Sequence, residues 1–362
     1  MKKKILIIDD SALMRRVLSD IINSDERFIV QDLASNGLEG FDLVTRENHN
    51  YDAIVLDINM PKMNGIEFME VLDKHHIKAT VIVVSTIAKD GAKETIRALE
   101  LGAFDFVTKP DSFYEAKSNQ FKEKILSTLL TATRLDNVLL KSNVVNVSTL
   151  KKIEKTKPIN QLQETRKSIK GNKLVALACS TGGPKALQSV IPYLPKNLDA
   201  AVLIVQHMPE GFTKSLAVRL NELSNITVKE AQDGEIIQKG VVYIAQGGRQ
   251  LRVKPDGGQY KLMVANEPAR MGLCPCADIM YESLVDTKYD EVTCVVLTGM
   301  GSDGTQGIKE LKEKKEVYTI AQDEATCTVY GMPKVVADAN LADEILPLTM
   351  IAEAIVKNVG VC

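Results

Sequence analysis

Residues 174–191 read LVALACSTGGPKALQSVI and contain the two patterns from which an alternating α/β fold is built. The uninterrupted apolar run over 174–178 is typical of a strand buried on both faces in a parallel sheet. Two glycines at 182–183 then permit a sharp turn, and the residues after Pro184 place apolar side chains on one helical face. The stretch predicts a strand, a tight turn and a helix, with Ser180 exposed where the strand ends.

Ser180 has two possible roles at such a turn. The arrangement is similar to the nucleophile elbow G-x-S-x-G, although Ala178 replaces the first glycine. A serine in this position also commonly caps the helix that follows. This stretch alone leaves both roles open.

Length and composition set the broad class. A chain of 362 residues that is 45% hydrophobic is expected to form two packed domains. Apolar runs stay well short of the roughly 18 residues of a membrane span, and Lys2-Lys3-Lys4 leads only into residues 5–8, so we expect neither a signal peptide nor a span. The six cysteines are expected to be reduced thiols of a cytoplasmic protein. Cys274-Pro-Cys276 is too tight and too far from histidines for a typical zinc site.

The charge is distributed unevenly along the chain. Residues 122–173 contain twelve basic and four acidic side chains, between two acidic segments that each have a net charge of −5. This basic segment has no strong strand signal after Leu140, and we expect a helix up to about that residue followed by a flexible, solvated linker. A nucleic-acid tail is the alternative, but the basic residues are spread out and Phe121 is the one aromatic nearby. We therefore expect no nucleic-acid partner and domains at 1–121 and 174–362.

Residues 1–121 alternate strand and helix patterns. This βαβα order predicts parallel strands with right-handed crossovers, which is a doubly wound sheet. The expected strands cover 4–8, 28–34, 53–56, 81–84 and 104–107, and the clearest helices cover 11–22 and 37–47.

Five polar side chains follow the ends of these strands: Asp9, Asp10, Asp57, Ser85 and Lys109. Ligands of open α/β sheets bind outside the carboxyl ends of the strands, so these groups are expected to converge. Three convergent carboxylates repel one another unless a cation joins them, and oxygen ligands of this kind suit Mg²⁺. A carboxylate can also attack phosphorus while a hydroxyl and an ammonium group hold the new phosphate oxygens. The pattern predicts a phosphorylated aspartate.

The motifs Ile8-Asp-Asp-Ser11, Asp57-Ile-Asn-Met-Pro-Lys-Met-Asn-Gly65 and Val107-Thr-Lys-Pro110 closely resemble the receiver domain of two-component response regulators. The resemblance implies a flavodoxin-like fold in which Asp57 accepts phosphate from a histidine kinase. It also implies roles for the surrounding residues. Mg²⁺ would be held by Asp9, Asp10, Asp57 and the backbone carbonyl of Asn59, the phosphate would be sensed by Ser85 and Lys109, and Phe106 would be the aromatic side chain that moves on activation.

The second half of the chain alternates in the same way. A buried strand at 200–205 leads to His207, the only histidine after residue 76. Short strands near 241–245, 250–253 and 260–264 are expected to form a hairpin-like insertion or a sheet edge. A helix is expected at 277–285, and a third buried strand at 292–297 precedes a helix near 306–315. These elements predict a second doubly wound, Rossmann-like domain.

The loop after the third strand contains Gly299, Gly301 and Gly304 in the spacing G-x-G-x-x-G, which also occurs in dinucleotide-binding folds. Asp303 would place a carboxylate inside a loop that should cradle a pyrophosphate, and this fingerprint normally opens its domain. Dinucleotide binding would also leave Ser180 without a role. An oxidoreductase nevertheless remains one alternative, and a response regulator whose output domain only binds a partner is another.

Ser180, His207 and Asp303 follow three different strands of this second domain. Serine becomes a good nucleophile when an imidazole accepts its proton, and a carboxylate orients that imidazole. Glycine-rich turns leave backbone N–H groups free for an oxyanion, and Met300 is a candidate donor. These residues predict an acyl-transfer triad with the chain order Ser, His, Asp.

The segments Ala178-Cys-Ser-Thr-Gly-Gly-Pro184, Gln206-His-Met-Pro-Glu-Gly-Phe212 and Leu297-Thr-Gly-Met-Gly-Ser-Asp-Gly304 are similar to the catalytic domain of the CheB family of chemotaxis methylesterases. The resemblance implies hydrolysis of glutamate γ-methyl esters, and deamidation of particular glutamines, on the cytoplasmic helices of chemoreceptors. Thr181 and Met300 would line this site, which needs no cofactor of its own. The sequence departs from the family at Cys274-Pro-Cys276, where a basic, polar loop is expected. The implied protein is a cytoplasmic monomer that is not inserted in the membrane.

Overall fold

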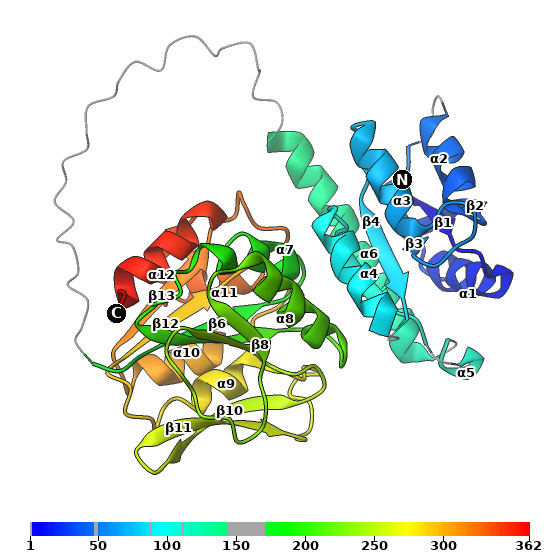
Figure 1. Ribbon diagram of the computed structural model, residues 1–362. Helices are drawn as coiled ribbons and strands as arrows, with labels where there is room; N and C mark the ends of the chain where they lie inside the picture. The colour runs from blue at the N-terminus through cyan, green and yellow to red at the C-terminus, as the bar shows by residue number, and fades with distance from the viewer. Residues whose placement is uncertain (1, 47–49, 87–88, 111, 117, 143–170) are drawn as a thin grey trace, which may run out of the picture.

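The computed structural model describes residues 2–46, 50–86, 89–110, 112–116, 118–142 and 171–362. Two α/β units follow each other along the chain, each built on a parallel sheet with helices on its faces (Figure 1). Residues 143–170, where the sequence predicts a flexible linker, lie outside the described part. The expected fold class, two doubly wound domains, is confirmed.

The first unit has a five-stranded sheet with the order β2-β1-β3-β4-β5, and every pair is parallel. This is the flavodoxin-like order, in which the chain crosses from one side of β1 to the other. Its strands are β1 (Lys3–Ile8), β2 (Phe28–Ala34), β3 (Ala53–Asp57), β4 (Val81–Ser85) and β5 (Asp105–Thr108). Its helices are α1 (Ala12–Asn23), α2 (Gly37–Thr45), α3 (Gly65–Lys74), α4 (Lys89–Glu100) and the short α5 (Phe113–Ala116).

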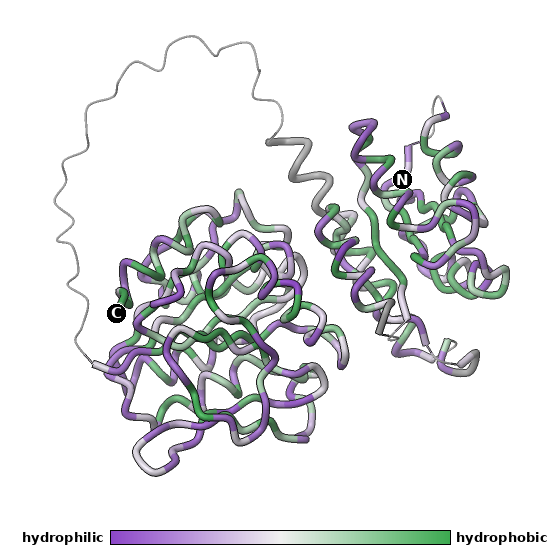
Figure 2. Tube along the Cα trace, in the orientation of Figure 1, coloured by the Kyte–Doolittle hydropathy of each residue, from purple (hydrophilic) through white to green (hydrophobic). Residues whose placement is uncertain are grey.

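Side-chain caps fix where the first three helices of this unit begin. Ser11, Asn36 and Asn64 each accept a hydrogen bond from a backbone N–H of the first turn. At Asn64 the Glu67 side chain bonds back to the cap, which completes a capping box. Between the helices the central strands are apolar, and Figure 2 shows this hydrophobic colouring along β4.

Helix α6 (Asn119–Ser142) runs from the first unit into the predicted linker. Phe121, Ile125, Leu129 and Ala132 are buried in the same cluster as the inner face of α1. The helix expected up to about Leu140 is present, but the predicted domain boundary at 121/122 falls inside it. At least up to Ala132, the supposed linker packs as a layer of the first unit, because its apolar residues recur at helical spacing.

The second unit has a seven-stranded parallel sheet with the order β14-β13-β12-β6-β7-β9-β8. Its strands are β6 (Lys173–Cys179), β7 (Ala200–Gln206), β8 (Thr227–Glu230), β9 (Val241–Ile244), β12 (Glu291–Val296), β13 (Val317–Gln322) and β14 (Glu344–Leu346). Its helices are α7 (Gly183–Gln188), α8 (Phe212–Leu223), α9 (Ala277–Glu282), α10 (Thr305–Lys312), α11 (Met332–Asp338) and α12 (Ile351–Val359), with one-turn 3₁₀ helices at Ile191–Tyr193 and Leu348–Met350.

The chain winds outward from β6 in both directions, first through β7 and later through β12. β6 is buried on both faces, as its apolar run predicts. Val175 and Leu177 pack towards α7, α8 and α12, whereas Leu174 and Ala176 pack towards α9, α10 and α11. The topological switch point therefore lies between β6 and β12, beside Ser180.

The residues between β8 and α9 contain the expected hairpin, whereas the first of the expected strands is not a sheet edge. β9 lies in the main sheet between β7 and β8, and β10 (Gln250–Asp256) and β11 (Gln259–Ala265) form a separate antiparallel hairpin. Leu251, Val253 and Leu262 of this hairpin pack into the cluster under α9. The hairpin thus covers the face of the sheet that carries α9.

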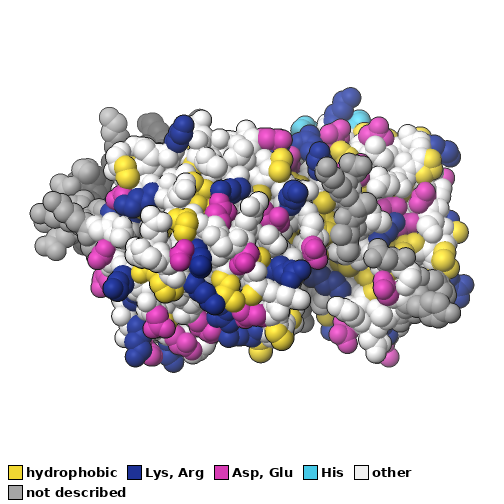
Figure 3. Space-filling model, turned by 60° about the horizontal axis from the view of Figure 1, so that its bottom comes forward, with side chains coloured by type: hydrophobic (Ala, Val, Ile, Leu, Met, Phe, Trp, Pro, Cys, Tyr) yellow, Lys and Arg dark blue, Asp and Glu magenta, His cyan; other side chains and the backbone are white. Residues whose placement is uncertain are grey.

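The two units are in contact through α4, which packs against α7 and α8 (Figure 1). One buried apolar cluster runs from the first unit through Phe106 to Phe212 and Ala186 of the second. Elsewhere the surface is mixed, and Figure 3 shows basic and acidic side chains interspersed over one face. Among the described helices, none combines the length and the apolar character that crossing a bilayer would require.

Candidate functional site

His207 and Asp303 form the most direct contact of the candidate site. His207 follows β7 and Asp303 lies in the loop between β12 and α10, 96 residues further along the chain. The imidazole Nε2 lies 2.7 Å from Asp303 Oδ2. Since Nε2 faces the carboxylate, its proton is held there, and Nδ1 remains as the basic nitrogen of the neutral ring.

Ser180 lies directly after β6, at the neighbouring strand end. Its backbone N–H donates to Thr298 O at 3.0 Å, and its carbonyl accepts from Gly183 N at 2.7 Å and from Gln206 Nε2 at 3.0 Å. A Cβ on Gly299 would lie 2.7 Å from Ser180 Cβ, a distance that real contacts almost never show. The glycine after Thr298 is therefore required by close packing against the serine.

Ser180 and Thr181, which follow β6, and His207, which follows β7, line one cavity of about 740 Å³, and Asp303 joins this group through its hydrogen bond to His207. The opposite wall comes from the first unit and includes Phe106 and Lys109. Within the described part of the chain, the Ser180 hydroxyl has no hydrogen bond to a protein group. The hydroxyl is therefore free of competing protein contacts in the cavity that His207 also lines.

Asp303 is buried, with its side chain only 5% exposed. Burial by itself raises the pKa of a carboxyl group, but here the hydrogen bond and charge of His207 oppose this effect. The backbone N–H groups of Ala277 and Asp278 donate to the carboxylate at 2.6 Å and 3.0 Å, and these hydrogen bonds also lower its pKa. Together they lower the pKa of Asp303 to about 2, so the group stays ionised beside the imidazole at any physiological pH.

Thr181 follows the serine and lines the same cavity, whereas Met300 lies in the loop between β12 and α10. The Thr181 hydroxyl donates to Asp105 Oδ2 of the first unit at 2.6 Å. Met300 is 55% exposed, and its sulfur lies 3.3 Å from Thr131 Oγ1 on α6. Both residues adjoin glycine turns, and both touch the first unit.

A second cluster lies at the strand ends of the first unit. Lys109 Nζ bridges Asp9 and Asp57, at 2.9 Å and 2.7 Å. Burial raises the pKa of Asp57 to about 6 against the lowering effect of Lys109. The pKa of Lys109 is also raised, because the two carboxylates outweigh the lowering effect of its burial.

The ligand atoms of Asp9, Asp10 and Asp57 all lie within 4.8 Å of one another. Three carboxylates against one ammonium group leave a net negative pocket, and an all-oxygen donor set of this kind fits Mg²⁺. Asn59 lies in the exposed bend just after β3, beside Asp57. These residues therefore fit the ion that the sequence predicts.

The residues predicted to sense phosphate are close to this pocket. Ser85 is buried, and its hydroxyl donates to Gly91 O of α4 at 3.3 Å. Phe106 is also buried, with its ring centroid 4.6 Å from that of Phe212, the first residue of α8. The structure thus joins β5 of the first unit to the helix that follows the His207 loop.

Two family models match this chain. The CheB methylesterase model covers residues 175–355, and the response regulator receiver domain model covers residues 5–117. The chain belongs to the CheB methylesterase family. It is therefore an enzyme with an attached receiver domain.

Two full-length relatives of this CheB-family chain are named protein-glutamate methylesterase/protein-glutamine glutaminase. One, from Geobacillus kaustophilus, is 40% identical over 99% of each chain. Another, from Halalkalibacterium halodurans, is 41% identical over 98% of this chain and 97% of its own. Among solved structures, the CheB methylesterase catalytic domain of Thermotoga maritima is 42% identical, covers 51% of this chain and 98% of its own, and superposes with a TM-score of 0.50.

Membership of the CheB family does not fit the two alternatives, an oxidoreductase and an output domain that only binds a partner. The structure of the glycine loop explains why its G-x-G-x-x-G spacing does not indicate dinucleotide binding. Gly299 is needed for packing against Ser180, and Gly304 starts α10 with a φ of 94°. The Gly304 N–H is already bound by the Asp278 carboxylate at 2.9 Å. The spacing serves a catalytic loop and not a pyrophosphate cradle.

Sequence reasoning missed several residues of the CheB-family site. Glu100 on α4 pairs with Arg219 on α8 across the two units, at 2.6 Å. Cys276 and Asp278 contact Asp303 and its loop from α9. None of these positions lies at the end of a sheet strand, so the signal used to find the other residues could not reveal them.

Proposed function

We propose that this chain is a phosphorylation-activated serine hydrolase that removes methyl groups from glutamate γ-methyl esters of chemoreceptors. Deamidation of specific glutamines on the same receptors is the second reaction, since an amide is attacked by the same nucleophile. The His207–Asp303 hydrogen bond beside a cavity shared with Ser180 is the observation that supports this function most strongly. The names of the full-length relatives support the substrate class.

Ser180 Oγ attacks the ester carbonyl while His207 Nδ1 accepts the serine proton. The imidazolium is stabilised by Asp303 and returns the proton to the leaving methoxide, so methanol departs and an acyl-serine remains. A water molecule, deprotonated by the same nitrogen, then hydrolyses the acyl-serine to the glutamate carboxylate and free Ser180. Thr181 and Met300 line the site where the oxyanion forms, and we assign backbone N–H donation to Met300.

In the receiver domain, Asp57 is the phosphate acceptor and a chemotaxis histidine kinase is the donor. Mg²⁺, held by Asp9, Asp10, Asp57 and the Asn59 carbonyl, would supply charge neutralisation at the phosphoryl group. Lys109 already reaches Asp57 and is the group that meets the new phosphate oxygens. Ser85 and Phe106 would then report the change to β5 and α4.

Regulation follows from the contact between the two units. Asp105 holds the Thr181 hydroxyl next to the nucleophile, and Phe106 stacks on Phe212. With these contacts in place, the receiver covers the cavity that a receptor helix must enter. Phosphorylation at Asp57 weakens the interface, and a gap of about 1 to 3 kcal/mol between closed and open forms is enough for a useful switch.

We propose a receiver domain at 1–121, a basic linker at 122–173 and a catalytic domain at 174–362, with the first part of α6 packed on the receiver. The protein is expected to act as a cytoplasmic monomer, without nucleic-acid binding or membrane insertion. Receptor helices reach the site from the membrane surface.

The test uses the purified full-length chain and membranes with methyl-labelled receptors, with and without Mg²⁺ and a small acyl phosphate donor. Methanol should be released, faster with the phosphodonor, and mass spectrometry should show glutamine converted to glutamate at receptor methylation sites. The Ser180→Ala variant should release no methanol above background. Release that survives this substitution would contradict the assignment of the nucleophile.

A shortened chain tests the occlusion. Removing residues 1–142, so that α6 leaves together with the domain on which it packs, should raise the rate of methanol release without phosphodonor. An unchanged rate would contradict inhibition by the receiver.

A further inference from the structure

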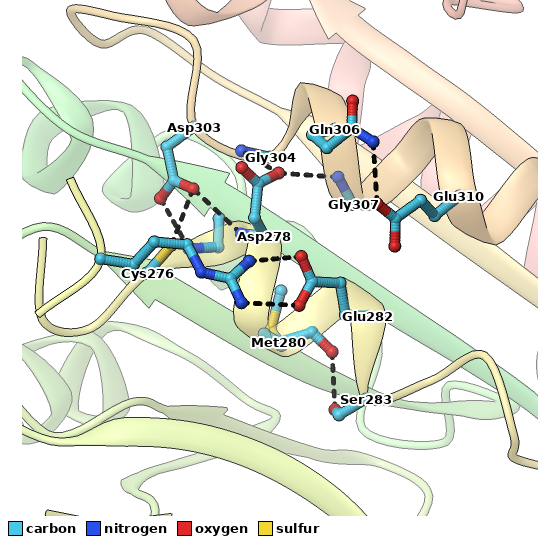
Figure 4. A network of polar contacts seen from close by, with 12 residues as sticks. Cys276, Asp278, Met280, Glu282, Ser283, Asp303, Gly304, Gln306, Gly307 and Glu310 are labelled. Carbon is cyan, nitrogen blue, oxygen red and sulfur yellow. Dashed lines mark hydrogen bonds and ion pairs between the residues drawn. The ribbon is translucent and has the colours of Figure 1, made fainter. Parts of the chain in front are cut away.

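The carboxylate of Asp303 lies against the beginning of α9 (Figure 4). Three successive residues of this segment supply donors to it. Cys276 Sγ lies 3.1 Å from Oδ1, Asp278 N–H donates to the same oxygen at 3.0 Å, and Ala277 N–H donates to Oδ2 at 2.6 Å. His207 Nε2 is the fourth partner, also on Oδ2. Each carboxylate oxygen thus has two hydrogen-bond partners, which fixes the rotation of the carboxylate.

Cys276 is the N-cap residue of α9, and its S–H group is directed at the Asp303 carboxylate. The residue is fully buried, and its backbone N–H is bound by Gln250 Oε1 at 2.8 Å. Gln250 is itself buried and donates to Leu273 O at 3.1 Å, so the Cys276 backbone is braced from β10.

The loop that carries Asp303 is tied to the same helix from the other side. Asp278 Oδ1 accepts from Gly304 N at 2.9 Å and from Gly307 N at 2.7 Å, as Figure 4 shows. The backbone of Asp278 thus binds Asp303, while its carboxylate binds the residue after Asp303. These N–H groups already occupy the carboxylates, which favours a hydrogen-bonded anchor over a cation site among these side chains.

Burial and the nearby Asp303 carboxylate keep Cys276 in the thiol form. Desolvation, with Asp303 as the next cause, raises the pKa of Cys276 to about 12. The group is therefore an S–H donor at physiological pH and not a thiolate. A thiol that donates to a carboxylate stabilises the ionised form of the acid, which is the form that orients the imidazole.

We propose that Cys276 is a positioning residue of this enzyme, which acts through Asp303 by donating the hydrogen bond that holds its carboxylate towards His207. The inference rests on the proposed function, because it assigns a role within the same reaction. Cys276 touches neither the substrate nor the reacting atoms. Its contribution is expected in kcat and not in KM.

The test compares Cys276→Ala and Cys276→Ser in the full-length chain, activated with Mg²⁺ and an acyl phosphate. Cys276→Ala should lower kcat for methanol release about tenfold with KM within twofold, the order expected when one hydrogen bond to a charged group is lost. Cys276→Ser keeps a donor and should restore kcat to within about threefold of the unmodified chain. The rate at which a fluorophosphonate probe labels Ser180 should follow the same order, without any receptor in the assay.

Cys294→Ala is the matched control, since Cys294 is another fully buried thiol of the second unit, on β12. It should lower the thermal unfolding temperature as Cys276→Ala does and leave kcat unchanged. If Cys276→Ala fails to fold, Cys276→Val fills the space without a donor and should show the same loss of kcat.

Two results would overturn the role of Cys276. One is a kcat for Cys276→Ala, or for Cys276→Val, equal to that of Cys294→Ala. The other is an equal loss in the alanine and serine variants, which would assign the effect to packing of the sulfur. If the unmodified chain itself releases no methanol and is not labelled, it is the proposed function that fails.

Discussion

Asp57 and Asp303 are both buried aspartates beside the carboxyl ends of parallel strands, yet their pKa values shift in opposite directions. The pKa of Asp57 is raised to about 6, and that of Asp303 is lowered to about 2. Burial raises both values, so it cannot explain the difference. Asp57 faces the carboxylates of Asp9 and Asp10 with Lys109 as its cation, whereas Asp303 receives three hydrogen-bond donors and an imidazole.

The comparison shows how one kind of strand end can serve two reactions. An acid surrounded by other acids is poorly satisfied until a cation and a phosphoryl group arrive, so the receiver site is built to change state. An acid surrounded by donors is satisfied from the start, so the catalytic site keeps one charge state throughout turnover. Substitutions at the two aspartates should change catalysis, stability and activation in different ways, and a substitution at the interface of the two units should have the smallest effect.

Asp303→Asn should have the largest effect on catalysis. The amide no longer carries the charge that stabilises the imidazolium, and it favours the wrong tautomer of His207. We expect kcat for methanol release to fall by about 10³ to 10⁴. Phosphorylation of the receiver by a labelled phosphodonor should continue at the normal rate, and a parallel loss of phosphorylation would mean that the variant is misfolded.

Asp57→Asn should stabilise the receiver in the absence of Mg²⁺. Because the folded pKa of about 6 lies above the ordinary value of 3.8, ionisation of Asp57 lowers stability as pH rises from about 4 to about 6. Removing the charge should raise the free energy of unfolding by about 3 kcal/mol at pH 7. Urea unfolding followed by circular dichroism, with EDTA present, should show this gain and its decrease towards pH 4. A gain independent of pH would contradict the pKa argument, and Mg²⁺ should reduce it by binding only the unmodified site.

The same variant should lose activation. With the phosphate acceptor gone, an acyl phosphate should no longer raise the rate of methanol release, which we expect to increase about tenfold in the unmodified chain. Chelation of Mg²⁺ should have the same consequence in the unmodified chain. Activation that persists in Asp57→Asn would place the phosphate on another residue.

Arg219→Ala should have the smallest effect. Arg219 pairs with Glu100 across the interface. Removing a partly exposed ion pair of this kind changes the free-energy difference between the closed and open forms by roughly 0.2 to 1 kcal/mol. The rate without phosphodonor should therefore rise by a factor of about 1.4 to 5. Arg252→Ala, which breaks the pair with Glu267 within the catalytic domain, is the control and should leave this rate unchanged. A double variant with Glu100→Ala should raise this rate slightly further, because Glu100 also accepts a hydrogen bond from Gln188 Nε2 of the second unit at 3.2 Å.

Many residues of the two candidate sites could be predicted from the sequence, because they lie after the ends of predicted strands. The polar residues at 9, 10, 57, 85 and 109, and those at 180, 207 and 303, lie at or beyond the ends of mainly apolar strands, and a parallel sheet brings such ends to one edge. The resemblance of these motifs to the receiver and CheB families then indicated which reactions the residues perform. The contacts of Cys276 with Asp303, and of Glu100 with Arg219, join residues on helices or loops whose relative placement no local pattern specifies.

The sequence by itself determined two alternating α/β units, their buried strands and the side chains at the strand ends, because hydrophobic periodicity and glycine turns are local properties of the chain. Tertiary structure alone decided that Nε2 of His207 faces Asp303, that α6 packs on the receiver, and that residues of the receiver line the Ser180 cavity. These features depend on which surfaces meet in space. That outcome is set by packing and by the satisfaction of buried polar groups over the whole molecule.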